Sequence, residues 1–185
     1  MSKPPYINVS KLDVAKRQLE IAITLFLTNS DPISIHTLSA AAHEVLNTLL
    51  KKQNLGRSFL DENVKRFIRP EKQKEVIDKI REAQNFFKHA DKDSDGVYKF
   101  HFKLTEFFLW DTCAMYQILT KEKTPLISVF LIWFYSAYPN ILLDEETKTL
   151  FLNCQNDLGV NPENRSEFLN LLPDIIKSRN RITKL

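Results

Sequence analysis

Prolines that begin helical patterns constrain the fold of this chain more than any other feature. Four of them stand at such starts: Pro32, Pro70, Pro125 and Pro162. At the first helical position the missing N–H of proline removes no hydrogen bond. A good N-cap residue precedes three of the four, namely Asp31, Thr124 and Asn161. Gly56 and Gly159 follow helical patterns, where glycine commonly ends a helix. This punctuation predicts a chain built from consecutive helices.

Apolar residues between these points recur at intervals of three and four, which is typical of amphipathic helices. We expect about seven or eight helices. The first begins near residue 10, and the others lie at about 32–53, 58–68, 70–89, 105–120, 125–138, 144–157 and 162–178. The last can divide at Pro173. The longest apolar run, residues 126–138, would span only about 20 Å as a helix, which is too short for a bilayer. We therefore expect a buried core helix there and no membrane partner.

One segment departs from helical spacing. Tyr98, Phe100, Phe102 and Leu104 alternate with polar residues, and a period of two indicates extended chain. No second strand pattern accompanies it, so we expect one short arm packed on helices. The predicted fold class is all-α, in a single helical domain over residues 1–185. Its core bundle would cover about 10–138 and a C-terminal helical extension about 144–180.

The composition is that of a globular protein, with 43% hydrophobic and 26% charged residues. Thirteen phenylalanines supply most of the aromatic content, and many lie between residues 86 and 138, where we expect the thickest core. The net charge of +3 does not by itself indicate a nucleic-acid partner. The N-terminus lacks the apolar stretch of a secretory signal, and Cys113 and Cys154 lack metal-ligand spacing. We expect a cytoplasmic protein with two buried, reduced thiols.

Three aspartates match the first half of an EF-hand loop. Asp91, Asp93 and Asp95 stand at positions one, three and five of such a loop, with Gly96 at position six. Position twelve, which requires a bidentate glutamate, is Phe102. Because a hard cation needs that carboxylate, we expect no calcium in this loop. We also expect no other metal and no cofactor. We interpret the segment as a solvated acidic loop.

The helix predicted before this loop ends in polar and basic residues. Arg81, Asn85 and Lys88 fall at i, i+4 and i+7, and His89 follows directly. On a continuous helix they would form one polar stripe. Such residues can bind a phosphate, and the histidine can transfer a proton near neutral pH. The alternative is that cations in a last helical turn simply complement the helix dipole.

Two further histidines, His36 and His43, lie seven residues apart in the helix predicted at 32–53. Seven residues rise by about 10 Å along a helix, too far for both to bind one metal ion. We expect a solvated or interface position for both, although one of them could face His89 across a pair of helices. No glycine-rich phosphate loop, CxxC pair, G-x-S-x-G or H-E-x-x-H motif occurs in the chain.

Two segments resemble a group of uncharacterised bacterial proteins. They are the helix start SIHTL at residues 34–38 and the helix end NFFKHAD at residues 85–91. The resemblance covers roughly the first two thirds of the chain, and it implies no activity.

More distantly, the arrangement resembles the HEPN superfamily, small helical bundles of bacterial toxin–antitoxin and defence systems. Its ribonucleases carry an arginine, a following polar residue and then a histidine, which meet across a homodimer cleft and cleave RNA without metal. By this resemblance Asn85 and His89 match the polar residue and the histidine. Gln84 stands where the arginine is expected, so Arg81 or Lys88 would have to supply the positive charge.

Two functions remain open at this point. The first is a HEPN-like binding or interaction module, which we expect to be a homodimer with a protein or RNA partner. The second is a metal-independent ribonuclease. In it His89 would act as general acid and base, Asn85 would orient it, and Arg81 or Lys88 would contact the phosphate. Whether the protein is an enzyme is not decided by the sequence.

Overall fold

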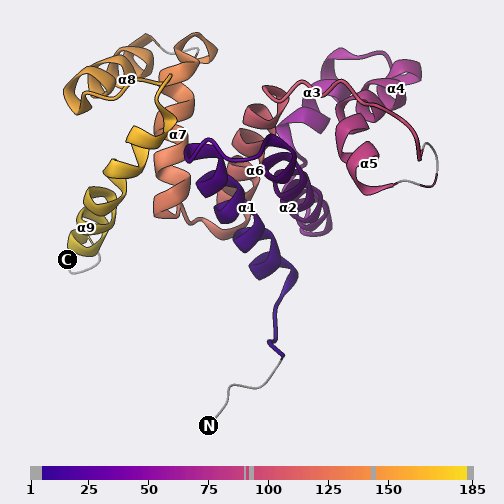
Figure 1. The fold of residues 1–185 in the computed structure, drawn as a ribbon, viewed down its shortest axis with the longest axis horizontal. Helices are drawn as coiled ribbons and strands as arrows, with labels where there is room; N and C mark the ends of the chain where they lie inside the picture. The colour runs from indigo at the N-terminus through magenta and orange to yellow at the C-terminus, as the bar shows by residue number, and fades with distance from the viewer. Residues whose placement is uncertain (1–5, 90, 92–93, 143–144, 183–185) are drawn as a thin grey trace.

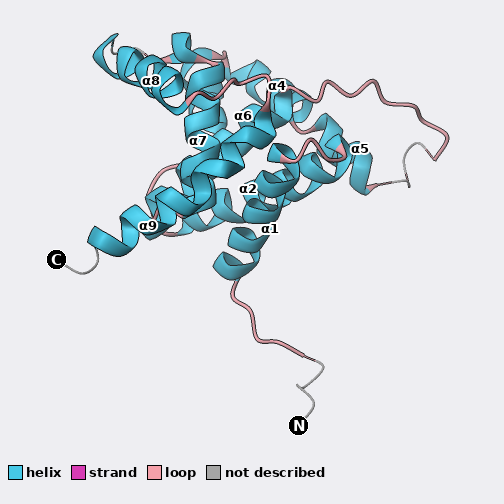
Figure 2. Ribbon diagram, turned by 60° about the vertical axis from the view of Figure 1, so that its left-hand side comes forward, coloured by secondary structure: helices cyan, strands magenta, loops and turns pink. Residues whose placement is uncertain are grey.

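A computed structural model describes residues 6–89, 91, 94–142 and 145–182. Over these residues the protein is all-helical and forms no strand, which confirms the predicted fold class (Figures 1 and 2). The α-helices are α1 (Lys11–Leu27), α2 (Pro32–Lys52), α3 (Phe59–Phe67), α4 (Pro70–Ile80), α5 (Glu82–Lys88), α6 (Leu104–Thr120), α7 (Pro125–Ala137), α8 (Glu145–Leu158) and α9 (Leu172–Ile182). Two short 3-10 helices, η1 (Pro139–Ile141) and η2 (Arg165–Leu171), complete the order.

Helix α2 lies at the centre of the bundle and packs against both α1 and α6 (Figure 1). Helix α7 packs against α1 and α6, and it carries α8, η2 and α9 on its other sides. Apolar side chains of α1, α2, α6 and α7 form one continuous core, and many of their rings meet edge to face. The largest fully buried side chains include Leu19, Ile23, Leu46, Leu109, Phe130, Phe134 and Phe168.

Local capping explains where several helices begin. The Ser10 hydroxyl accepts a hydrogen bond from the backbone of Asp13, whose carboxylate accepts one in return from the Ser10 backbone. The side chains of Asp31 and Thr124 cap α2 and α7. Proline occupies the first helical position of α2, α4 and α7, as predicted. At Gly159 a φ of 62° ends α8 in the left-handed region that favours glycine.

The helix predicted at 162–178 is wrong at its start. The Asn161 side chain accepts a hydrogen bond from the Glu163 backbone, and the Asn161 carbonyl accepts one from Asn164. These bonds close a turn, so helical structure begins only at Arg165, as the 3-10 helix η2. The α-helical part then begins at Leu172, next to the division expected at Pro173.

The single helix predicted at 70–89 is also wrong, because it is two helices. Arg81, with φ −93° and ψ 0°, ends α4 and begins α5. The division lets α5 pack Ala83 and Gln84 on α2, whereas α4 fully buries none of its described side chains. An open groove of about 330 Å³ separates the inner face of α4 from α6. Its lining includes Val76, Ile80, Phe107 and Phe108.

The expected extended arm is only partly right. Tyr98 and Phe100 are half-buried against helices, and the Phe100 ring lies 5.2 Å from that of Phe87. Phe102 and Leu104 are exposed, because the chain turns at Phe102 and α6 already begins at Leu104. The alternation of apolar residues therefore has structural meaning only up to Phe100.

The segment beyond residue 139 contributes to the same core as the N-terminal helices. Val160 and Phe168 belong to the buried cluster. The indole N–H of Trp133 donates to the Pro162 carbonyl at 3.0 Å, which fixes the loop before η2 on α7. Within the described part of the chain, no helix combines the length and apolar character that crossing a bilayer would require.

Cys113 is a free thiol in the core, and burial raises its pKa well above the ordinary value. The side chain of Cys154 and the whole of Asp93 lie outside the described residues.

Candidate functional site

The polar stripe expected from the sequence does not converge on one place. The Arg81 guanidinium lies 3.6 Å from Asp61 of α3. The Lys88 ammonium lies 3.5 Å from Glu44 of α2. Asn85 and His89 instead line a groove that neither Arg81 nor Lys88 lines. The structure thus brings Asn85 and His89 together and separates them from Arg81 and Lys88.

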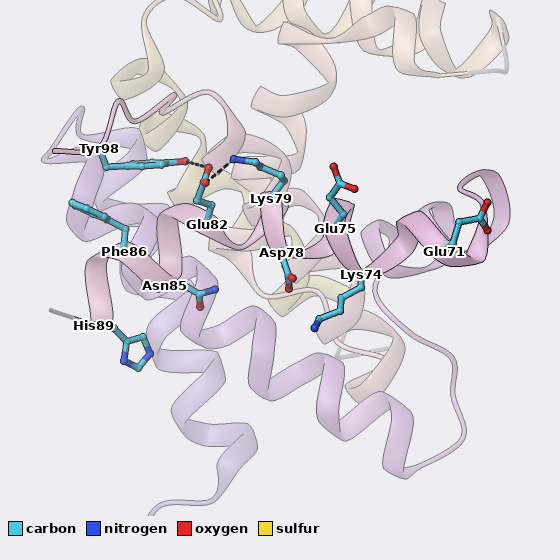
Figure 3. A pocket seen from close by; sticks show the side chains of 10 residues that line it. All are labelled: Glu71, Lys74, Glu75, Asp78, Lys79, Glu82, Asn85, Phe86, His89 and Tyr98. Atoms are coloured by element: carbon cyan, nitrogen blue, oxygen red, sulfur yellow. Dashed lines mark hydrogen bonds and ion pairs between the residues drawn. The ribbon is translucent and has the colours of Figure 1, made fainter. Parts of the chain in front are cut away.

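This groove, which we call the α4–α5 groove, has a volume of about 780 Å³ (Figure 3). Along α4 and the start of α5 it is lined by Glu71, Lys74, Glu75, Asp78, Lys79 and Glu82. Asn85, Phe86, His89 and Tyr98 complete it. Figure 3 shows the ring of Tyr98 lying over that of Phe86, and the two are stacked at a centroid distance of 5.3 Å.

Carboxylates outnumber ammonium groups in the α4–α5 groove by four to two. Glu82 is anchored by the Lys79 ammonium at 2.7 Å and by the Tyr98 hydroxyl at 3.3 Å. The hydrogen bond from Lys79 lowers the pKa of Glu82, so this carboxylate is charged at neutral pH. Burial, followed by the charge of Glu82, raises the pKa of Tyr98, which keeps its hydroxyl protonated. Asp78 is exposed and takes part in no ion pair among the described residues.

His89 stands at the exposed end of the groove. Its side chain is 56% exposed, and its Nδ1 atom lies 3.9 Å from a carboxylate oxygen of Asp91. The nearby residue 84, where the resemblance to HEPN ribonucleases led us to expect an arginine, is a buried glutamine whose amide donates to Glu44 at 3.0 Å. That side chain points to α2, away from the groove that His89 lines. Within one chain, the surroundings of His89 are therefore acidic.

His36 is buried, so of the solvated or interface position expected for it, the solvated one is wrong. Only 1% of the residue is exposed, because α2 buries a second face against α6. Its Nδ1 atom lies 3.0 Å from the Thr105 hydroxyl, and its Nε2 atom has no partner among the described residues. The rings of Phe87, Phe100 and Phe108 surround the imidazole. Burial lowers the pKa of His36 to about 4, so the ring is neutral at pH 7.

The low pKa of His36 makes stability depend on pH. Between the unfolded value near 6.5 and the folded value of about 4, the unfolded chain binds a proton that the folded chain does not. The contribution of His36 to the free energy of unfolding is therefore fully present well above pH 6.5. It falls by about 3 kcal/mol as the pH drops to 4. Urea unfolding across this range should show a shallower loss for His36→Gln than for the wild type. The exposed His101, changed to Gln, is the matched control, and equal slopes for all three proteins would contradict the prediction.

His43 is buried too, and it takes part in a polar network instead of lying in solvent. Its Nε2 atom lies 2.9 Å from Asp111 of α6. The same carboxylate accepts hydrogen bonds from the backbone N–H groups of Phe59 and Leu60, at 2.8 and 3.3 Å. These are the first N–H groups of α3, which the helix itself cannot satisfy. Asp111 thus joins α2, α3 and α6.

A second branch of the network runs through Asn47 of α2. The side-chain oxygen of Asn47 accepts a hydrogen bond from the Ser58 backbone N–H at 3.0 Å, and its side-chain NH₂ donates to the Asp61 carboxylate at 2.9 Å. Lys51 donates to the same carboxylate at 2.8 Å, and Arg81 lies nearby. Desolvation opposes ionisation of Asp61, but these hydrogen bonds and charges prevail and lower its pKa below the ordinary value. The network holds α3 in place, and it leaves Arg81 committed to a structural contact.

Comparisons with protein-family models, with curated proteins and with solved structures found no match to this chain. The site must therefore be interpreted from its own chemistry. Among the described residues, no group of three or more His, Cys, Asp or Glu side chains is placed to hold a metal ion.

Sequence reasoning missed Asp111 and Glu106 in α6. Both are buried carboxylates in a helix whose other buried residues are mostly apolar. A carboxylate in an apolar helix is a usable signal, because a buried charge requires a partner. The spacing of His36, His43 and Asn47 on one face of α2 is the matching signal for a buried polar face.

Proposed function

We propose that this protein is a binding module whose α4–α5 groove accepts a lysine- or arginine-containing segment of a partner protein. The observation that carries the proposal is the excess of carboxylates over ammonium groups beside an aromatic pair. Carboxylates attract cationic side chains, and the faces of Phe86 and Tyr98 offer cation–π contacts. A groove of about 780 Å³ has room for one or two long side chains of such a segment.

The ribonuclease hypothesis receives less support from the same geometry. An RNA backbone brings one negative charge per phosphate, and an acidic groove repels it. The two cations that would bind the phosphate are paired with Asp61 and Glu44 instead. A HEPN-like homodimer in which a second copy supplies the cations remains the form in which that hypothesis can be tested.

A charge reversal in the groove tests the binding proposal. Asp78→Lys should weaken binding of a fluorescent peptide of alternating lysine and alanine by about three- to tenfold, because it replaces an attraction with a repulsion. Fluorescence anisotropy at low and at 0.5 M salt measures the effect, and the difference between the proteins should shrink at high salt. The exposed Asp157→Lys on α8 changes the net charge equally and should bind like the wild type.

Two outcomes would contradict the proposal. One is equal binding of the lysine peptide by both variants and the wild type. The other is cleavage of single-stranded RNA by the purified protein that His89→Ala abolishes while the circular dichroism spectrum is unchanged. The second result would also establish the ribonuclease function.

A further inference from the structure

Two adjoining cavities lie apart from the α4–α5 groove, where the α1–α2 turn and the start of α6 meet the end of α7 and the loop before η2. The larger has a volume of about 500 Å³ and the smaller about 190 Å³. Asn29 and Arg165 line both of them, so the two spaces share a wall. Together they combine a polar and an apolar compartment, as small-molecule sites commonly do.

The shared wall is held rigidly. Arg165 donates to Glu106 at 2.7 Å, and the hydroxyl of Tyr138 donates to the other oxygen of the same carboxylate. The guanidinium lies 4.1 Å from the centre of the Phe26 ring, which it covers. Glu106 is only 3% exposed, so this carboxylate is a buried charge with two firm partners. Groups fixed in this way lose little entropy when a ligand binds.

The larger cavity carries charges of both signs and an unsatisfied hydroxyl. Lys103 and Glu163 are exposed residues on its rim, where they add one charge of each sign to the Arg165–Glu106 pair. The residue Ser136 lines the cavity, and its buried hydroxyl oxygen has no hydrogen-bond partner among the described residues. A buried polar group without a partner is costly, and rotation of the Ser136 side chain toward the cavity would let a polar ligand satisfy it.

The smaller cavity is mainly apolar. Its lining includes Phe26, Pro32, Ile35 and Phe102. It offers room for a single apolar side chain, directly beside the charged compartment. A ligand that fits both spaces therefore needs an anionic group, a cationic group and one compact apolar group close together.

We propose that the two cavities bind a free α-amino acid with an aromatic or branched apolar side chain. Its carboxylate faces Lys103 and Arg165, and its ammonium group faces Glu163 and donates to the Ser136 hydroxyl. Its side chain occupies the smaller cavity. The site is separate from the proposed partner groove and does not depend on it.

Tryptophan fluorescence provides the test, because Trp133 lines the larger cavity and Trp110 lines neither. Titration with each of the twenty amino acids should give a saturable change with phenylalanine or leucine. Phenylalaninol lacks the carboxylate and 3-phenylpropionate lacks the amine, so each should bind at least about tenfold more weakly. The proposal is overturned if no amino acid gives a saturable change at millimolar concentration, or if the two analogues bind as well as phenylalanine.

Variants at the rim separate ligand contacts from effects on folding. Lys103→Gln and Glu163→Gln change exposed residues and should each raise the dissociation constant about tenfold, with an unchanged melting temperature of the free protein. Ser136→Ala removes the unsatisfied hydroxyl and should also weaken binding. Lys123→Gln, at an exposed position outside both cavities, is the matched control. Wild-type affinity in all three site variants would equally overturn the proposal.

Discussion

Replacing Asp111 with alanine should lower the free energy of unfolding by about 3–5 kcal/mol, because it leaves buried partners without their acceptor. The carboxylate is completely buried and serves His43 together with the backbone N–H groups of Phe59 and Leu60. All three donors would lose their acceptor, and His43 would stay buried without a partner. For a protein of this size the melting temperature should fall by about 10 °C. Urea unfolding followed by circular dichroism measures the free energy, and thermal unfolding measures the melting temperature.

A near-isosteric change separates the hydrogen bonds from the packing. Asp111→Asn keeps an oxygen that can accept from the Phe59 N–H, so it should cost clearly less than Asp111→Ala. Asp157→Ala, at an exposed position of α8, should change stability by no more than about 0.5 kcal/mol. If the free energy of unfolding of Asp111→Ala lies within about 1 kcal/mol of the wild-type value, Asp111 does not organise α3 as the structure indicates.

Replacing Glu106 with alanine should have an effect of similar size, about 3–5 kcal/mol, for a different reason. Its removal leaves the mostly buried Arg165 as an uncompensated charge between the bundle and η2. Tyr138 loses its acceptor at the same time. The loss should be visible in urea unfolding and as faster proteolysis of the segment beyond residue 139.

A double variant distinguishes the cost of leaving Arg165 as an unpaired charge from the loss of its attraction to Glu106. Arg165→Met keeps an apolar chain over Phe26 and removes the charge, so Glu106→Ala combined with Arg165→Met should be more stable than Glu106→Ala alone. A double variant that is less stable by the sum of the two single effects would show that the residues act independently.

Helix starts could be predicted because their causes are local. The proline at the first position of α2 and the capping aspartate before it are neighbours in sequence, and so are Ser10 and Asp13 in α1. The division of the helix predicted at 70–89 could not be predicted in this way. Its division at Arg81 comes with the packing of α5 on α2, and with an ion pair to α3 twenty residues earlier in the chain.

The candidate site shows the same limit. The sequence spacing predicted that Asn85, Lys88 and His89 lie near one another. The direction in which each side chain leaves the helix, however, decides which groove it enters. The partners of His36 and His43 lie 69 and 68 residues away in α6. A polar residue next to an apolar stripe is predicted to be solvated as long as the helix that packs on it is unknown. Only the tertiary structure shows that α2 is covered on two faces.

Helix α4 is attached to the protein differently from the other wall of the groove. It fully buries none of its described side chains, stands over an open space of about 330 Å³ and is joined to its neighbours at Pro70 and Arg81. Moving it breaks few apolar contacts, so its displacement costs far less than unfolding the bundle. We therefore expect the α4 wall of the α4–α5 groove to move more easily than the α5 wall. If the groove binds a partner segment as proposed, its width would change with the size of that segment.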